Sequence, residues 1–437
     1  MKKILFLLAA AALMLTACRK DEEILVKVSV QLTQFGKPFT ETVPVMLASA
    51  AASYTQETDE TGKALFEVPF GAYTASVSFK KGNTNYNGTT QVVVEMQTAD
   101  PETGEIPALP VTIALTASNT SALIIKEYYA AGCKDNAGTK NYFYDKYIII
   151  YNNSDQEVDA SRMCITMAQN SNTQAANKYT ITDGVPEYEI AGWTPASFGI
   201  WWFQTEVKMA PYSQIVVAIN GAIDHTKTYN NSVNLSTADY VFYDKESGYN
   251  LAAAYPAPAE AINPSHYMKT YQFGQGTVWA PLPANSAPYL LIPEEGVDIQ
   301  EWVKTESNFD NRGTNKSTNF AKVPISWVMD ALEEWPEEDA TKYFSRFPAA
   351  VNTGHVLATK YLGYTIYRNV DKQATEAIAE NAGKLVYNYA GAVSEEDTDP
   401  SGIDAEASIA NGAKIVYMDT NNSANDFHQR SVSSLKK

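Results

Sequence analysis

The chain has 437 residues, of which 33 are Lys or Arg and 50 are Asp or Glu, giving a formal net charge of −17. Apolar residues make up 45% and charged residues 19%, a balance typical of globular proteins rather than disordered chains. Nucleic acid is excluded as an expected partner, because phosphate backbones are bound by clustered cations. The length allows two or three domains.

A lipoprotein signal peptide is predicted at the start of the chain. Two lysines precede an apolar run over residues 4–15, which is too short to cross a bilayer as a helix. The sequence LTAC at residues 15–18 is a lipobox. We therefore expect residues 1–17 to be removed and Cys18 to carry the lipid that anchors the protein to a membrane.

The next segment, residues 18–23, is predicted to be a short tether. Its basic and then acidic order resembles the export tag with which Bacteroidetes lipoproteins reach the outer face of the outer membrane. The resemblance implies Lys20, Asp21 and Glu22 as the tag, and a lipid-anchored location at the cell surface. An ordinary solvated tether has the same composition, so this alternative stays open.

Residues 24–117 are predicted to form a β-sandwich, because short runs of alternating apolar residues are separated by turn signals. The sequence TDETGKALF at 58–66 is followed by PFGAY at 69–73. This pair of motifs resembles the carboxypeptidase-regulatory-like domain, which has a transthyretin-type sandwich. In surface proteins that family supplies mostly spacers, so the resemblance brings no catalytic residue.

Residues 118–437 are predicted to form a larger β domain with helical and loop insertions. The strands ALIIKEYY at 122–129 and YIIIYNNS at 147–154, followed by MAPYSQIVVA at 209–218, resemble the lamin-tail immunoglobulin-like fold. Apolar spacing predicts inserted helices over 324–335 and 371–382. The fold class is therefore mainly β, a transthyretin-like sandwich followed by a lamin-tail-like domain.

Two segments near the end of the chain, VPISWVMD at 323–330 and KIVYMDTNNSANDF at 414–427, resemble an uncharacterised family of Bacteroidetes lipoproteins. Members of that family are often encoded near TonB-dependent outer-membrane receptors. The resemblance implies such a receptor as a partner, and it implies no chemical activity.

Once Cys18 is lipidated, two cysteines remain, Cys133 and Cys164. An exported compartment permits a disulfide between them, and buried free thiols are the alternative. No C-x-x-C motif occurs, which disfavours redox catalysis and structural zinc.

No catalytic or metal-binding constellation is recognised. The four histidines are far apart in sequence, and the H-E-x-x-H, G-x-S-x-G and P-loop motifs are absent. The acidic run over 395–404 has carboxylates that could hold calcium, but the EF-hand spacing is missing and a solvated acidic loop is favoured. We therefore expect no catalytic residue, no metal site and no cofactor. Calcium is the one cation that remains an alternative.

Two tryptophans are the expected ligand-binding residues. Trp201 and Trp202 are adjacent, and neighbours on a strand face opposite sides, so one of them is expected at the surface. Trp202, together with Trp279 in a long loop, could then stack on a sugar ring or another flat ligand. The alternative is an edge strand or a loop that covers the core.

These observations predict a non-enzymatic surface lipoprotein of the outer membrane that captures a ligand or docks on a TonB-dependent receptor. A structural or adhesive scaffold is the alternative, and a hydrolase is the third hypothesis.

Overall fold

The computed structural model describes residues 25–436 apart from 35–36, 50–51, 82–83, 100, 102, 120, 169–178, 180–185, 250–254, 274–277, 280, 282, 312–318 and 338–343. The expected signal peptide, Cys18 and the tag residues Lys20, Asp21 and Glu22 lie outside the described residues.

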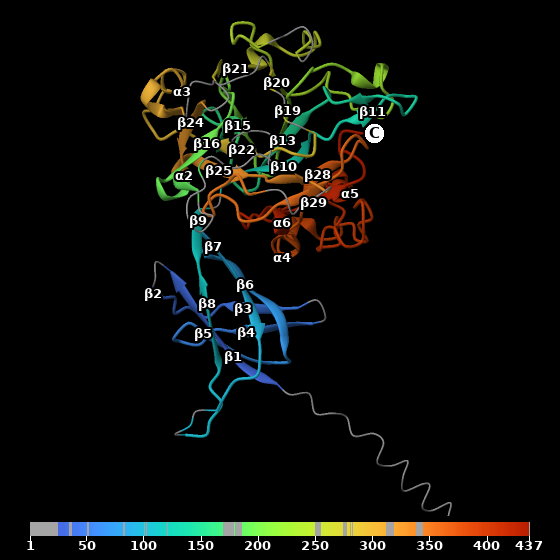
Figure 1. The fold of residues 1–437 in the computed structure, drawn as a ribbon. Coiled ribbons are helices and arrows are strands. Elements are labelled where there is room, and N and C mark those ends of the chain that lie inside the picture. Colours follow the sequence, from blue (N-terminus) through green and yellow to red (C-terminus); the bar gives the residue numbers. More distant parts are fainter. Residues whose placement is uncertain are drawn as a thin grey trace, which may run out of the picture. The chain divides into compact units, whose positions relative to one another are not determined.

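The chain divides into two compact units, and β-strands dominate the described parts of both (Figure 1). One unit runs to Phe79 and includes Tyr86–Thr116, and the other contains Lys80–Asn85 and Ala117–Lys437. The predicted fold class, mainly β with an N-terminal sandwich and a larger β domain, is confirmed at this level.

The N-terminal unit consists of two sheets that enclose one apolar core. The first sheet contains β1 (Val26–Gln34), β2 (Lys37–Pro38), β5 (Lys63–Val68) and β8 (Leu109–Ala114). The second has the order β4 (Ser53–Glu57), β3 (Pro44–Ala48), β6 (Gly71–Lys81), β7 (Thr84–Val94) and β9 (Thr116–Asn119). Along β1 and β5 buried and more exposed residues alternate, as expected for strands that cover the core with one face.

The turn before β5 explains the TDETG motif. Asp59 Oδ1 accepts hydrogen bonds from the backbone N–H and the hydroxyl of Thr61 and from Lys63 N–H. Gly62 has φ +76°, and a Cβ there would lie 1.9 Å from the carbonyl oxygen of Phe39. Only glycine fits this position, because it combines left-handed backbone with close packing against the backbone of Phe39.

The larger unit is organised around one long sheet (Figure 1). Among the described residues its strand order is β25 (Val328–Ala331), β22 (Pro288–Leu291), β15 (Cys164–Met167), β17 (Gly199–Trp202), β21 (Tyr267–Gln272), β20 (Tyr240–Phe242), β19 (Gln214–Ala218), β13 (Tyr147–Asn152), β10 (Leu123–Tyr129), β28 (Thr365–Arg368) and β29 (Phe427–Arg430).

This sheet curls, so that β25 comes close to β10. The backbone N–H of Ile125 on β10 donates to Asp330 Oδ2 on β25 at 2.6 Å. The same carboxylate pairs with the buried guanidinium of Arg368 on β28. The contact therefore joins two strands that are distant along the sheet order, and it encloses the main core between them.

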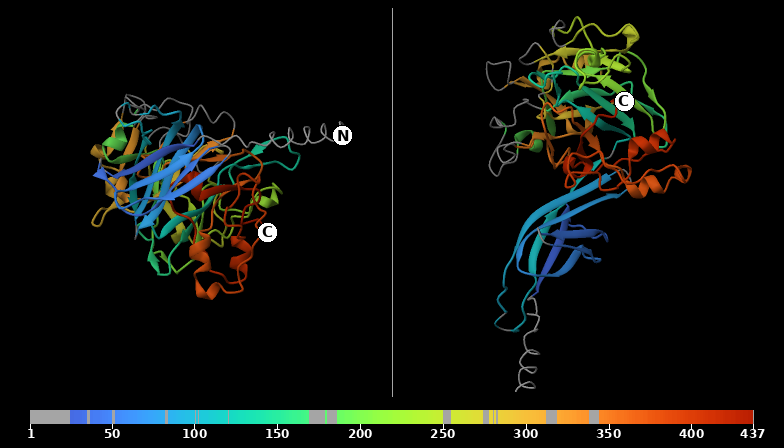
Figure 2. Two further views of the ribbon diagram at one scale, coloured as in Figure 1. Left: turned by 90° about the horizontal axis from the view of Figure 1, so that it is seen from below. Right: turned by 90° about the vertical axis from the view of Figure 1, so that its right-hand side faces the viewer.

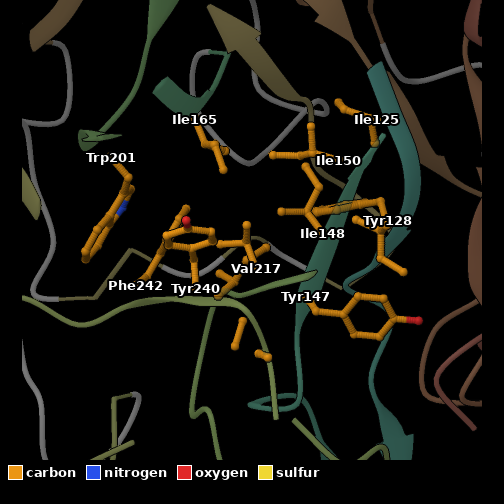
Figure 3. Packing of buried hydrophobic residues seen from close by; sticks show 14 of the residues in the cluster. Ile125, Tyr128, Tyr147, Ile148, Ile150, Ile165, Trp201, Val217, Tyr240 and Phe242 are labelled. Atoms are coloured by element: carbon orange, nitrogen blue, oxygen red, sulfur yellow. The ribbon is translucent and has the colours of Figure 1, made fainter. Parts of the chain in front are cut away.

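Side chains of the sheet enter different cores on its two faces. The main core contains Ile148, Val217 and Phe242, and Trp201 stacks on Phe242 with ring centroids 4.3 Å apart (Figure 3). Trp202, next in sequence, belongs to a second core with Tyr289 and Leu291. All four residues of β17 are buried, so this part of the sheet is covered on both faces.

Shorter elements complete the larger unit, whose C-terminal segment from β28 onward is drawn in orange to red in Figure 2. The remaining described strands are β11 (Cys133–Lys134), β12 (Asn141–Tyr142), β14 (Val158–Asp159), β16 (Trp193–Ala196), β18 (Lys208–Met209), β23 (Phe309–Asn311), β24 (Asn319–Pro324), β26 (Glu334–Pro336) and β27 (Val356–Ala358). The helices are α2 (Glu187–Ile190), α3 (Ile299–Trp302), α4 (Lys372–Glu376), α5 (Ala405–Ala410) and α6 (Ser423–Asp426), and the 3₁₀ turns are η2 (His225–Lys227), η3 (Pro264–His266), η4 (Glu306–Asn308), η6 (Ile325–Trp327) and η8 (Ala379–Asn381).

The predicted helix over 324–335 is wrong. That segment ends β24, makes the single turn η6 and continues as β25, which pairs with β22. Apolar residues at helical spacing also suit strands that are buried on both faces. The second predicted helix, over 371–382, is confirmed only in part, since α4 begins after Asp371 and ends at Glu376.

Within the part of the chain that the structure describes, no helix is long and apolar enough to span a membrane.

Candidate functional site

Three loops of the larger unit meet at its surface and present aromatic side chains. They are the hairpin of β11 and β12 with the residues that follow it, the segment around η2, and the loop before β28. Their half-buried aromatic residues form what we call the tyrosine loop cluster: Tyr142, Phe143, Tyr144, Tyr229 and Tyr361.

Hydrogen bonds fix the three loops to one another. Asn136 of the hairpin accepts from Asn230 N–H at 2.8 Å and donates to the Thr228 carbonyl at 3.1 Å. The third loop joins the hairpin through Tyr361 N–H, which donates to the Ala131 carbonyl at 3.0 Å. Because each loop is held by another, the aromatic side chains are positioned before any ligand arrives.

The hairpin depends on a glycine at its base. Gly132 has φ +72°, and a Cβ there would lie 2.3 Å from the carbonyl oxygen of Tyr142. At the tip of the hairpin, Asp135 Oδ1 accepts from the backbone N–H groups of Thr139 and Lys140. These hydrogen bonds hold the pKa of Asp135 below its usual value.

The rings contact one another in a fixed arrangement. Tyr142 and Tyr229 stack with centroids 4.0 Å apart and planes inclined by 20°. The hydroxyl of Tyr142 lies 2.7 Å from Nδ1 of the buried His225, which fixes the rotation of the ring. Tyr144 contacts both Tyr142 and Phe143, with centroids 6.2 and 4.8 Å apart, and Phe143 lies 6.5 Å from Tyr361.

Asp145, which directly follows the aromatic run, is buried beneath the cluster. Its Oδ2 accepts from the hydroxyls of Ser232 at 2.6 Å and Tyr129 at 3.1 Å. The thiol of Cys133 also points to this oxygen, at 3.6 Å. One carboxylate thus ties together a core strand, the hairpin and the segment after η2.

The expected disulfide is not formed, and the structure has the alternative arrangement of free thiols. Cys133 and Cys164 are both buried and unbonded to each other. Burial and the neighbouring Asp145 raise the pKa of the Cys133 thiol to about 12, so it stays a neutral donor. Cys164 packs in the second core, and its thiol points to the Arg162 carbonyl at 3.5 Å.

The expected ligand anchors Trp202 and Trp279 do not lie at the surface. Trp202 is 9% exposed and packs in the second core, and Trp279 is fully buried in the main core beside Phe242. The sheet is covered on both faces at β17, so the adjacent Trp201 and Trp202 enter two different cores and neither faces solvent. The two tryptophans are core residues, which corrects the prediction.

Polar groups surround the tyrosine loop cluster. Lys134 Nζ lies 5.7 Å from the centre of the Tyr361 ring and donates to Asn141 Oδ1 at 2.6 Å. Leu362, beside the cluster, is 50% exposed. Half-exposed aromatic faces next to amide and ammonium groups are suited to ligands that combine an apolar face with hydroxyl groups.

The acidic run over 395–404 serves the local fold. Asp399 accepts from Val370 N–H and Ser401 N–H, and Asp404 caps α5 through Ala407 N–H. Among the described residues, no group of three or more His, Cys, Asp or Glu side chains is arranged to hold a metal ion. The calcium hypothesis therefore gains no support from these carboxylates.

Sequence reasoning missed the tyrosine loop cluster, although a signal was present. Residues 141–145 read NYFYD, with three adjacent aromatic residues between polar ones. On a regular strand such a run exposes at least one ring unless both faces are covered. Tyr229 and Tyr361 had no comparable signal, because only the fold brings them to this place.

Comparisons with known proteins agree with this architecture. The sequence profile described as "Protein of unknown function (DUF4876)" matches residues 210–434, slightly more than half of the chain. A crystal structure of a DUF4876 family protein from Bacteroides thetaiotaomicron is 20% identical, covers 93% of this chain and 96% of its own, and has a TM-score of 0.51. This likeness supports the fold.

Other similarities are weaker. A DUF3823 family protein from Parabacteroides merdae is 11% identical over 43% of this chain and 92% of its own, with a TM-score of 0.18. The major pilin subunit of Bacillus cereus is 9% identical over 77% of this chain and 99% of its own, with a TM-score of 0.19. No curated protein matches the sequence.

Proposed function

Because the chain belongs to the DUF4876 family, whose function is unknown, we propose a function from its own residues. The protein is a non-enzymatic lipoprotein at the outer surface of the outer membrane, and it captures a ligand through the tyrosine loop cluster. The lipid on Cys18 anchors it, and Lys20, Asp21 and Glu22 direct it to the outer face.

The tyrosine loop cluster is the single observation that carries this proposal. Its five half-buried aromatic residues come from three loops that are hydrogen-bonded to one another. Loops held rigidly by a β scaffold are a common place for recognition sites. Tyrosine combines a large contact area with little conformational freedom to lose, so such a surface favours binding.

Carbohydrate is the ligand class that fits best. A sugar ring offers an apolar face to Tyr229 or Tyr361 and hydroxyl groups to Lys134, Asn136 and Asn141, which all belong to the hairpin. The N-terminal unit, which resembles a transthyretin-type spacer, would hold the lamin-tail-like domain away from the membrane. A TonB-dependent receptor would be the partner that accepts the captured ligand.

A gel-retardation experiment tests ligand capture. Soluble protein beginning at Arg19 is run through native gels that contain a panel of soluble neutral and acidic polysaccharides. We expect at least one polysaccharide to retard the wild type, and Tyr142→Ala with Tyr229→Ala to abolish the retardation. Tyr271→Ala is the matched control, because Tyr271 is a 41% exposed tyrosine on β21. Migration unaffected by every polysaccharide would contradict capture of carbohydrate.

Fractionation of cells tests the anchor separately. Cys18→Ala should release the protein from membranes or block its processing, because the lipid is attached to that thiol. Replacing Lys20, Asp21 and Glu22 by alanine should leave the protein lipidated but shielded from external protease. Unchanged membrane association of Cys18→Ala would reject the lipoprotein assignment.

A further inference from the structure

A second feature of the larger unit lies at the end of β29, at a residue that is not part of the tyrosine loop cluster. The guanidinium of Arg430 contacts two aromatic rings, with its central carbon 4.9 Å from the centre of Tyr367 and 5.7 Å from that of Tyr389. Arg430 is half-buried, and its Nε is buried without a hydrogen-bond partner.

The guanidinium makes no hydrogen bond or ion pair with any residue that the structure describes. This is unexpected in a chain with 50 acidic and 33 basic residues. An arginine side chain has five N–H donors in a planar fork. In a half-buried guanidinium these groups usually donate hydrogen bonds to carboxylates or carbonyls.

Two carboxylates that act electrostatically on Arg430, those of Glu127 and Glu406, are occupied by other donors. Glu127 accepts from the hydroxyls of Tyr147 and Ser434, and burial raises its pKa, which favours its neutral form. Glu406 Oε1 pairs with Lys126 Nζ at 2.7 Å and accepts from the Tyr367 hydroxyl at 2.6 Å. The charge of Arg430 is therefore left without a direct counterion.

Both rings that flank the guanidinium are fixed by hydrogen bonds. The hydroxyl of Tyr367 is held by Glu406, as described above. The hydroxyl of Tyr389 lies 2.8 Å from His428 Nε2, and His428 Nδ1 lies 2.7 Å from Asn369 Oδ1. Burial and the charge of Arg430 lower the pKa of His428 to about 3, so the imidazole is neutral and adds no competing charge.

We propose that Arg430 is the anchor of a second binding site, which takes a small ligand bearing a carboxylate or a phosphate group. Either group presents two oxygens in the spacing that a guanidinium fork recognises. Tyr367 and Tyr389 hold the fork in place, so little side-chain freedom is lost on binding. The proposal rests on Arg430 and its surroundings, and not on ligand capture by the tyrosine loop cluster.

Titration of the soluble protein with acetate and with inorganic phosphate, at constant ionic strength, tests the proposal. Arginine is labelled with ¹⁵N, and the Nε–Hε signals are followed by NMR. We expect a saturable shift of the Arg430 signal with at least one probe, and the probe that binds more tightly identifies the oxyanion. Arg430→Lys has no such signal, so its affinity is compared with that of the wild type by calorimetric titration. It should bind about ten-fold more weakly, because an ammonium lacks the planar fork.

Arg162→Gln is the matched control, because Arg162 Nη2 already donates to the carbonyls of Pro293 and Glu294. In this variant the dissociation constant obtained from the Arg430 signal should stay within two-fold of the wild-type value. Should Arg430→Lys fail to fold, Tyr389→Leu replaces it, since that variant keeps the arginine and removes one supporting ring. The absence of a saturable Arg430 shift in the wild type, or an equal shift of the Arg162 signal, would overturn the proposal.

Discussion

Two regions of the larger unit use aromatic residues in opposite ways. Around Trp201 and Trp279 the rings are fully buried, and Trp201 stacks on Phe242 within the main core. In the tyrosine loop cluster the rings of Tyr142, Tyr229 and Tyr361 are half-buried and supported by loops. The first region stabilises the domain, and the second is the surface that we propose for ligand capture.

The difference shows that the type of residue does not identify a recognition site. Tryptophan is the larger ring and was the expected anchor, yet a sheet covered on both faces removes it from solvent. Tyrosine at a loop keeps one face accessible while its hydroxyl is hydrogen-bonded, as Tyr142 shows with His225. Variants in the two regions should therefore separate stability from binding.

The largest effect is expected in the tryptophan core. Replacing Trp279 by alanine leaves a cavity beside Phe242 and should lower the free energy of unfolding by about 3 to 5 kcal/mol. Urea denaturation followed by circular dichroism measures this change. A loss below about 1 kcal/mol would show that Trp279 is not packed as the structure places it.

A buried carboxyl group should make the core sensitive to pH. Burial raises the pKa of Glu334 to about 7 from its ordinary value of 4.5, so the folded state holds a proton that the unfolded state loses earlier. This contribution is fully present below pH 4.5 and disappears as the pH rises through 7. As the pH rises from 5 to 8, the free energy of unfolding of Glu334→Gln should increase by about 2 kcal/mol relative to that of the wild type.

Denaturation curves at several pH values check this prediction, and Glu301→Gln, an exposed position, is the control. Lys146 acts in the opposite direction at higher pH, because burial lowers its pKa to about 7 and stability then rises from pH 7 upward. A stability difference between Glu334→Gln and the wild type that is constant with pH would refute the buried titration.

The hairpin under the tyrosine loop cluster should be sensitive at one backbone position. Gly132→Ala requires a strained φ and brings Cβ against the Tyr142 carbonyl, so we expect a loss of about 1 to 3 kcal/mol. Gly138→Ala is a useful comparison, since Gly138 also has φ +72° but no atom lies within 4 Å of its Cβ position. Equal losses in both variants would show that strain alone, without the contact, explains the effect.

The two buried thiols should differ in their reactivity toward alkylating reagents between the folded and the unfolded protein. Cys133 and Cys164 are free and buried, so native protein should resist alkylation. Denatured protein should take up two alkyl groups without reductant, as measured by intact mass. Absence of alkylation under these conditions would mean that the two cysteines pair after all.

The sequence predicts the two units unequally. In the N-terminal unit, alternation along Val26–Gln34 and the Asp59 turn specify strands and their register, because one face of each strand is solvated. In the larger unit β10, β13 and β17 are buried throughout, so no alternation is left to read. Burial on both faces of the sheet also explains why a helix was wrongly predicted at 324–335 and why Trp202 was wrongly expected at the surface.

The candidate sites depend on long-range contacts that a single sequence does not reveal. The run NYFYD at 141–145 marks one of the three aromatic loops, but nothing near Tyr229 indicates its stack on Tyr142. Likewise, Arg430 follows a histidine and a glutamine that carry no visible motif. Its two tyrosine neighbours come from β28 and from a loop about 40 residues before it.

The central claim is that ligand affinity resides in the tyrosine loop cluster, while stability resides in the tryptophan core. Calorimetric titration of the retarding polysaccharide into Tyr229→Ala and into the control Tyr271→Ala, with the melting temperature of each, tests it most directly. We predict at least a ten-fold weaker affinity for Tyr229→Ala, about 1.4 kcal/mol or more, with a melting temperature near that of the wild type. Equal affinity of the two variants would contradict the claim.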